Sequence, residues 1–67
     1  MERNSFYDQA TRAETLSKQI EAFRKNKESL SVVSRYKVYS DLNSAILNIP
    51  NDMLRDVLLN QLRECGV

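Results

Sequence analysis

The chain has 67 residues, a formal net charge of +1, no histidine and one cysteine. This length allows one small domain, the lone cysteine excludes an intrachain disulfide, and the near-neutral charge argues against attraction of the whole molecule to nucleic acid or membranes. Without histidine or a second thiol we expect no metal site and no cofactor. Because a domain of this size is only marginally stable, and neither a disulfide nor a metal can stabilise it, we expect it to gain stability from a partner or a second copy.

Turn-forming residues are scarce, since Pro50 and Gly66 are the only proline and the only glycine. A β-sandwich or barrel needs turn signals every 8 to 12 residues, and this sequence lacks them. Residues 1–67 are therefore predicted to form a single all-α domain. We expect either a helical hairpin or a three-helix bundle of amphipathic helices.

The first helix is predicted over residues 5–25. Ser5 and Asp8 have the spacing of a capping box, and three acid–base pairs at i,i+4 support the helix: Asp8–Arg12, Glu14–Lys18 and Glu21–Lys25. Apolar residues recur every seven positions on two neighbouring rows, as in a coiled coil, although Gln9 and Lys27 interrupt them. The rows contain Phe6, Ala13, Ile20, Leu16, Phe23 and Leu30.

A bend is predicted over residues 26–31. Asn26 can adopt the left-handed conformation that ends many helices, and Ser29 or Ser31 can cap the next helix. Because no residue here forbids a helix, a continuous helix through this segment stays open as the alternative.

The second helix is predicted over residues 32–48, where apolar residues follow the 3–4 spacing of a helix. Residues 32–39 are rich in β-branched and aromatic side chains, so a short strand is the alternative there. The apolar face contains Val32, Tyr36, Tyr39, Leu42, Ile46 and Ile49.

The third helix is predicted over residues 51–65. Pro50 ends the preceding helix, because the residue before proline avoids helical geometry, and Pro50-Asn51-Asp52 suits a helix start. Gly66 is placed to end it. Its apolar face contains Met53, Leu54, Val57, Leu58, Gln61, Leu62 and Cys65.

Catalytic chemistry finds little support in the sequence. Neither Cys65 nor any serine has a histidine to activate it, and no glycine-rich phosphate-binding motif is present. A chain this short is also expected to leave little room for a pocket of about 300 Å³. We therefore expect no enzyme activity and no small-molecule substrate.

A basic cluster occupies residues 24–37, a segment that contains five cations and a single acidic residue, Glu28. The cluster could bind phosphate or an acidic protein surface, with Tyr36 and Tyr39 able to stack on bases. The simpler interpretation is a solvated loop with cations at a helix end. The five cations are Arg24, Lys25, Lys27, Arg35 and Lys37.

The number of apolar residues favours an interaction function. Most are expected in an internal core, made of Phe6, Leu16, Ile20, Phe23, Tyr36, Tyr39, Leu42, Ile46, Leu54, Leu58 and Leu62. A small core cannot enclose the remaining apolar residues as well, and apolar side chains left on the surface are typical of an interface. The residues expected outside the core are Tyr7, Val33, Val38, Leu47 and Leu59.

We therefore expect a helical protein–protein interaction module, such as an adaptor, regulator, inhibitor or co-chaperone, that binds another protein or forms a homo-oligomer. The rows of the first helix are the predicted contact residues: Phe6, Ala13, Leu16, Ile20, Phe23 and Leu30. The alternative is a small nucleic-acid-binding regulator that uses the basic cluster. No apolar run resembles a signal peptide or a membrane helix, so we expect a cytoplasmic protein without a membrane partner.

Overall fold

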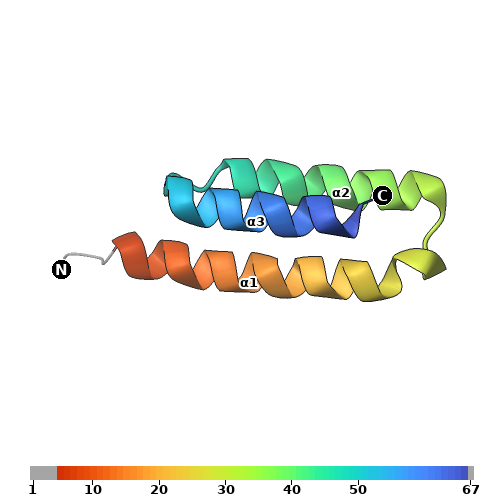
Figure 1. The fold of residues 1–67 in the computed structure, drawn as a ribbon, viewed down its shortest axis with the longest axis horizontal. Helices are drawn as coiled ribbons and strands as arrows, with labels where there is room; N and C mark the ends of the chain where they lie inside the picture. Colours follow the sequence, from red (N-terminus) through yellow and green to blue (C-terminus); the bar gives the residue numbers. More distant parts are fainter. Residues whose placement is uncertain (1–4, 67) are drawn as a thin grey trace.

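The computed structural model describes residues 5–66, and the side chains of residues 8–66. Three helices, α1 (Ser5–Asn26), α2 (Val32–Leu47) and α3 (Asp52–Cys65), pack side by side, and each contacts the other two. The 3₁₀ turn η1 (Lys27–Ser29) and a short corner connect them. Helices α1 and α3 run in the same direction and α2 runs opposite to both (Figure 1). The all-α prediction is confirmed, whereas the strand over residues 32–39 and the continuous helix are wrong.

The bend after α1 forms in a different way from the one predicted. Asn26 has φ −108° and ψ 0°, and the described residues include no residue other than glycine with a positive φ. Instead, η1 closes with a hydrogen bond from the backbone nitrogen of Leu30 to the oxygen of Lys27 (3.0 Å), and Leu30 is extended. A tight 3₁₀ turn redirects the chain without a left-handed residue.

Both following helices begin at a polar cap. The Ser31 side chain accepts a hydrogen bond from the backbone nitrogen of Ser34 (3.2 Å), which confirms one of the two predicted caps. The Asn51 side chain accepts one from the backbone nitrogen of Leu54 (3.0 Å). Helix α3 therefore starts at Asp52, one residue later than predicted, because Asn51 is the cap and Pro50 precedes it.

An arginine four residues after each cap binds the connection that precedes its helix. Arg35 Nε donates to the carbonyl oxygens of Lys27 (2.6 Å) and Leu30 (3.1 Å). Arg55 Nη1 donates to the carbonyl oxygen of Ile49 (3.1 Å), and its Nη2 contacts Asp52. A cation near a helix N-terminus is disfavoured by the helix dipole. The hydrogen bonds that each arginine makes to carbonyls of the preceding connection offset that cost, because a bond from a charged donor is stronger than one from a neutral donor.

The core lies between the three helices and draws residues from all of them. Ile46, Ile49 and Leu62 are fully enclosed. The complete set is Ala13, Leu16, Ile20, Phe23, Leu42, Ile46, Ile49, Leu58, Leu62 and Cys65. Most of the predicted core is confirmed, with Tyr39 and Leu54 packed against it only in part, while the side chain of Phe6 lies outside the described residues.

The prediction that Tyr36 lies in the core is wrong, because 61% of its surface is exposed. It precedes Leu42 by six residues, which is about a third of a turn around the helix at 100° per residue. Helix α2 buries the side of Leu42 and Ile46, so the predicted apolar face is wider than the buried one. For the same reason Val32 on α2, and Met53 and Val57 on α3, remain exposed.

Candidate functional site

The contact residues predicted on the first helix are used within the molecule. Ala13, Leu16, Ile20 and Phe23 are each no more than 7% exposed, and Leu30 packs in part against the same core. The side chain of Phe6 lies outside the described residues. The heptad rows therefore face α2 and α3 of the same chain, because a three-helix bundle needs an apolar stripe of this width on α1.

Contacts within the chain also occupy much of the predicted basic cluster. Lys27 Nζ donates to the carbonyl oxygen of Cys65 at the end of α3, and Arg35 binds the first connection. Arg24 Nη2 lies 2.8 Å from both carboxylate oxygens of Glu21. Among the described residues, only Lys25 and Lys37 of the five have no hydrogen bond or ion pair.

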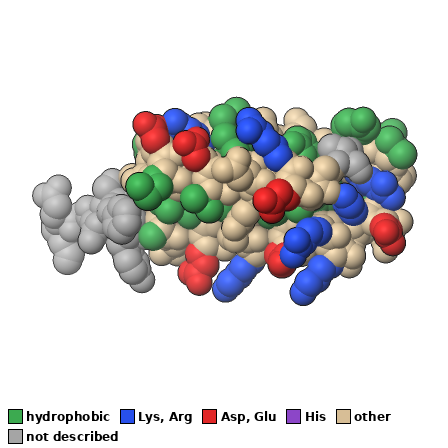
Figure 2. All heavy atoms as spheres, viewed as in Figure 1, with side chains coloured by type: hydrophobic (Ala, Val, Ile, Leu, Met, Phe, Trp, Pro, Cys, Tyr) green, Lys and Arg blue, Asp and Glu red, His purple; other side chains and the backbone are tan. Residues whose placement is uncertain are grey.

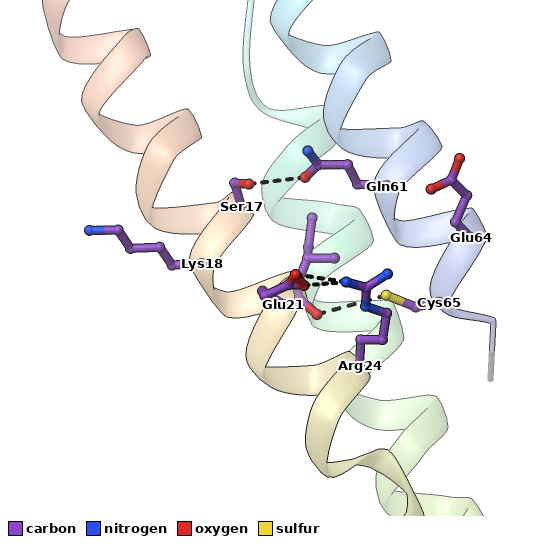
Figure 3. Close-up of a pocket in the computed structure, with 8 residues that line it drawn as sticks. Ser17, Lys18, Glu21, Arg24, Gln61, Glu64 and Cys65 are labelled. Carbon is purple, nitrogen blue, oxygen red and sulfur yellow. Dashed lines mark hydrogen bonds and ion pairs between the residues drawn. The ribbon is translucent and has the colours of Figure 1, made fainter.

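An open groove of about 330 Å³ runs between α1 and α3 (Figure 3). This hollow is larger than expected for so short a chain. Lys18 points away from it, while Ser17 and Gln61 point toward one another across it. The groove is lined by Ser17, Lys18, Ile20, Glu21, Arg24, Gln61, Glu64 and Cys65.

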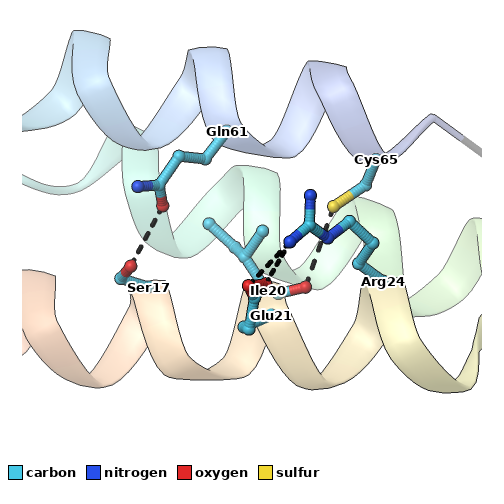
Figure 4. A network of polar contacts seen from close by, with 6 residues as sticks. All are labelled: Ser17, Ile20, Glu21, Arg24, Gln61 and Cys65. Atoms are coloured by element: carbon cyan, nitrogen blue, oxygen red, sulfur yellow. Dashed lines mark hydrogen bonds and ion pairs between the residues drawn. The ribbon is translucent and has the colours of Figure 1, made fainter.

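The polar groups in the groove connect the two helices (Figure 4). Ser17 Oγ donates to Gln61 Oε1 (3.1 Å), and the Cys65 thiol donates to the carbonyl oxygen of Ile20 (3.7 Å). Burial raises the pKa of the Cys65 thiol, although Arg24 and Lys27 oppose this effect. The thiol is thus kept protonated, whereas a nucleophilic cysteine needs a lowered pKa.

This arrangement offers no activated nucleophile. The Ser17 hydroxyl donates to an amide oxygen, which is not a base, and the Glu21 carboxylate is held by Arg24. Within residues 8–66, no three side chains of the metal-binding types come close enough to hold an ion. None of the described helices is both long and apolar enough to cross a bilayer.

A more distinctive feature is the solvent side of α2. Val32 and Val33 are 62% and 78% exposed where the helix begins, close to Tyr36, and Leu47 is 55% exposed where it ends. Hydrophobic side chains gather at the end of the molecule where α2 starts, whereas acidic and basic groups alternate along α1 (Figure 2). We define the α2 face as Val32, Val33, Tyr36, Ser40, Asn43 and Leu47, which lie within about 100° of one another around the helix.

The α2 face is predicted in part by the sequence. Val33 and Leu47, which the sequence predicts to lie outside the core, are exposed, whereas Val38 and Leu59, for which it predicts the same, are half-buried against the core. Tyr7 lies outside the described side chains. Sequence reasoning missed Val32 and Tyr36, because they continue the period of the buried residues.

Comparison with known proteins adds no relative: no protein-family model matches the sequence, no curated protein matches it, and no solved structure matches the fold.

Proposed function

We propose that the protein is a helical protein-interaction module that binds another protein, or itself, through the α2 face. The observation that carries this proposal is that four large apolar side chains stay exposed on one face of α2 although the chain fills its own core. Exposed apolar side chains gathered on one surface are typical of interaction sites, whereas scattered ones are ordinary.

The composition of the α2 face supports binding to an apolar helix or groove. It contains no charged residue, and depletion of charge with enrichment of aromatic residues characterises the centre of interfaces. The exposed positions recur at intervals of three, four and seven, the spacing by which one helix docks on another. Adaptor, regulatory and co-chaperone roles all fit this mode of binding.

The alternative, a nucleic-acid-binding regulator that uses the basic cluster, has weaker support. Lys27 and Arg35 each donate a hydrogen bond to backbone carbonyls, and Arg24 is paired with Glu21. Among the described residues, only Lys25 and Lys37 of the cluster have no hydrogen bond or ion pair within the chain, and binding to nucleic acid needs several phosphate contacts.

Photo-crosslinking in the cells that produce the protein tests the proposal. A benzophenone amino acid would replace Tyr36 on the α2 face and, as a matched control, the exposed Thr15 on α1. We expect a discrete protein adduct from position 36 that is lost when Val33→Glu is added, and none from position 15. The same adducts from both positions, or none from position 36, would contradict the proposal.

A further inference from the structure

We propose that the α2 face is the contact surface of an antiparallel homodimer, in which α2 packs against α2 of a second copy across a twofold axis near Ser40. This inference rests on the proposed function, because it names the partner of the same face. It predicts that the purified chain associates without any other protein.

The positions of the apolar residues suit a twofold arrangement. Val33 and Leu47 each lie seven residues from Ser40, on opposite sides of it, and seven residues are close to two helical turns. All three positions therefore lie on one line along the helix. In an antiparallel pair, Val33 of each copy meets Leu47 of the other, so the same apolar contact forms twice, as an isologous interface requires.

The middle of the face allows the two helices to approach closely. Ser40 is exposed and small, and Asn43 beside it carries no charge. Small residues at a crossing point let helix backbones come near each other without displacing a large side chain. The larger side chains, Tyr36 and Leu47, lie on either side of that point.

Charge complementarity selects the antiparallel direction. Lys37 and Asp41 lie on the same edge of the α2 face, four residues apart and on either side of its middle, and both are exposed. Neither has an ion-pair partner in the part of the chain that the structure describes. An antiparallel pair brings Lys37 of each copy near Asp41 of the other, which forms two ion pairs, and such pairs fix orientation more than they add affinity.

The size of the face sets the expected strength. Helix α2 has 16 residues, which gives a length of about 24 Å. A contact along one such helix falls at the low end of specific interfaces, below about 1,200 Å² in total. We therefore expect a reversible dimer that dissociates on dilution.

Sedimentation equilibrium of the purified chain tests the dimer. The Cys65→Ala background removes intermolecular disulfides. We expect a monomer–dimer equilibrium, and we expect Val33→Glu to shift it to monomer while circular dichroism stays helical. The exposed Thr15→Glu on α1 is the control and should not change association. A monomer at all concentrations, or a dimer that Val33→Glu does not weaken, would overturn the inference.

The direction of pairing is tested by charge reversal and by crosslinking. Lys37→Glu and Asp41→Lys should each weaken the dimer, and the double variant should restore it. In the same background, oxidation should crosslink Ser40→Cys at the twofold axis but not Val33→Cys, whose two copies lie at opposite ends of the contact. Efficient crosslinking through Val33→Cys, or no rescue by the double variant, would contradict an antiparallel pair.

The two proposals fail in different ways. If the purified chain stays monomeric while position 36 crosslinks to a different protein, the homodimer is wrong and the interaction function stands. If the chain is monomeric and position 36 captures nothing, both proposals are wrong.

Discussion

At the scale of single residues, the cations are as much structural as they are surface groups. Arg35 and Arg55 each follow a helix cap by four residues and bind carbonyls of the connection before it. Lys27 does the same for the end of α3. The Lys27 contact satisfies a carbonyl at a helix end, and the arginine contacts bind the connections, which gives these cations a structural role near the bends.

Replacing Arg35 tests this interpretation. We expect Arg35→Ala to lower the free energy of unfolding by about 1.5–3 kcal/mol, the usual contribution of hydrogen bonds made by a charged group. Lys37→Ala, on the exposed side of the same helix, should change it little. Urea denaturation of dilute protein measures both, and equal effects of the two substitutions would show that the Arg35 contacts contribute nothing particular.

The burial of the Cys65 thiol leads us to expect a loss of folding stability at alkaline pH. Burial raises its pKa above the ordinary value of 9.0. The contribution of the thiol to folding stability is therefore complete below that value and is lost as pH rises through the higher folded-state pKa. In that range the unfolded chain releases the proton while the folded chain still holds it. Between about pH 8 and about pH 10 we expect a larger fall in urea midpoint for the native sequence than for Cys65→Ala. All other ionisable groups are the same in both proteins, so their effects cancel in this comparison. Parallel falls would refute the prediction.

At the scale of elements, α2 has two apolar sides with different roles. Leu42 and Ile46 face the core, while Val33 and Tyr36 face solvent. A helix that only covers a core has one apolar stripe. The second stripe on α2 is what separates this helix from α1, whose solvent side is largely polar and charged.

The cap of α3 gives a prediction at this scale. Asn51→Ala removes the acceptor for the backbone nitrogen of Leu54 and should cost about 1 kcal/mol, which corresponds to a fall in Tm of roughly 4–8 °C for a domain of this size. The exposed Asn60→Ala in the same helix is the matched control and should be neutral or slightly stabilising, since alanine favours helix. Thermal unfolding by circular dichroism compares them. Equal shifts would mean that Asn51 does not act as a cap.

At the scale of the whole molecule, stability depends on a small core shared by three helices. Ile46 is fully buried, whereas its neighbour Leu47 is 55% exposed. A large-to-small substitution at a buried aliphatic residue typically costs 2–5 kcal/mol, a large part of the stability of a small domain.

This contrast predicts opposite outcomes at adjacent positions. Ile46→Ala should leave the chain largely unfolded at room temperature, while Leu47→Ala should keep the melting curve of the dilute, monomeric protein and weaken self-association instead. Circular dichroism melts and sedimentation equilibrium separate the two effects. A folded Ile46→Ala protein, or an unfolded Leu47→Ala protein, would invalidate the assignment of the two sides of α2.

The sequence by itself determined the class and the elements. Scarce glycine and proline together with the 3–4 apolar spacing predicted three helices with ends close to those observed, because caps and Pro50 act locally. It also predicted that Val33 and Leu47 would stay outside the core, because neither lies on the main apolar stripe.

Only the tertiary structure decided which apolar side faces inward. Tyr36 and Leu42 both fit the helical period, and the rotation of α2 against α1 and α3, which no local pattern specifies, exposes one and buries the other. The same packing placed the described heptad residues of α1 in or against the core. It also brought Lys27 to the carbonyl oxygen of Cys65, far along the chain, and Arg35 to the carbonyl oxygen of Lys27 across the bend. Periodicity shows that a helix has an apolar side, but the neighbouring helices determine how much of that side they cover.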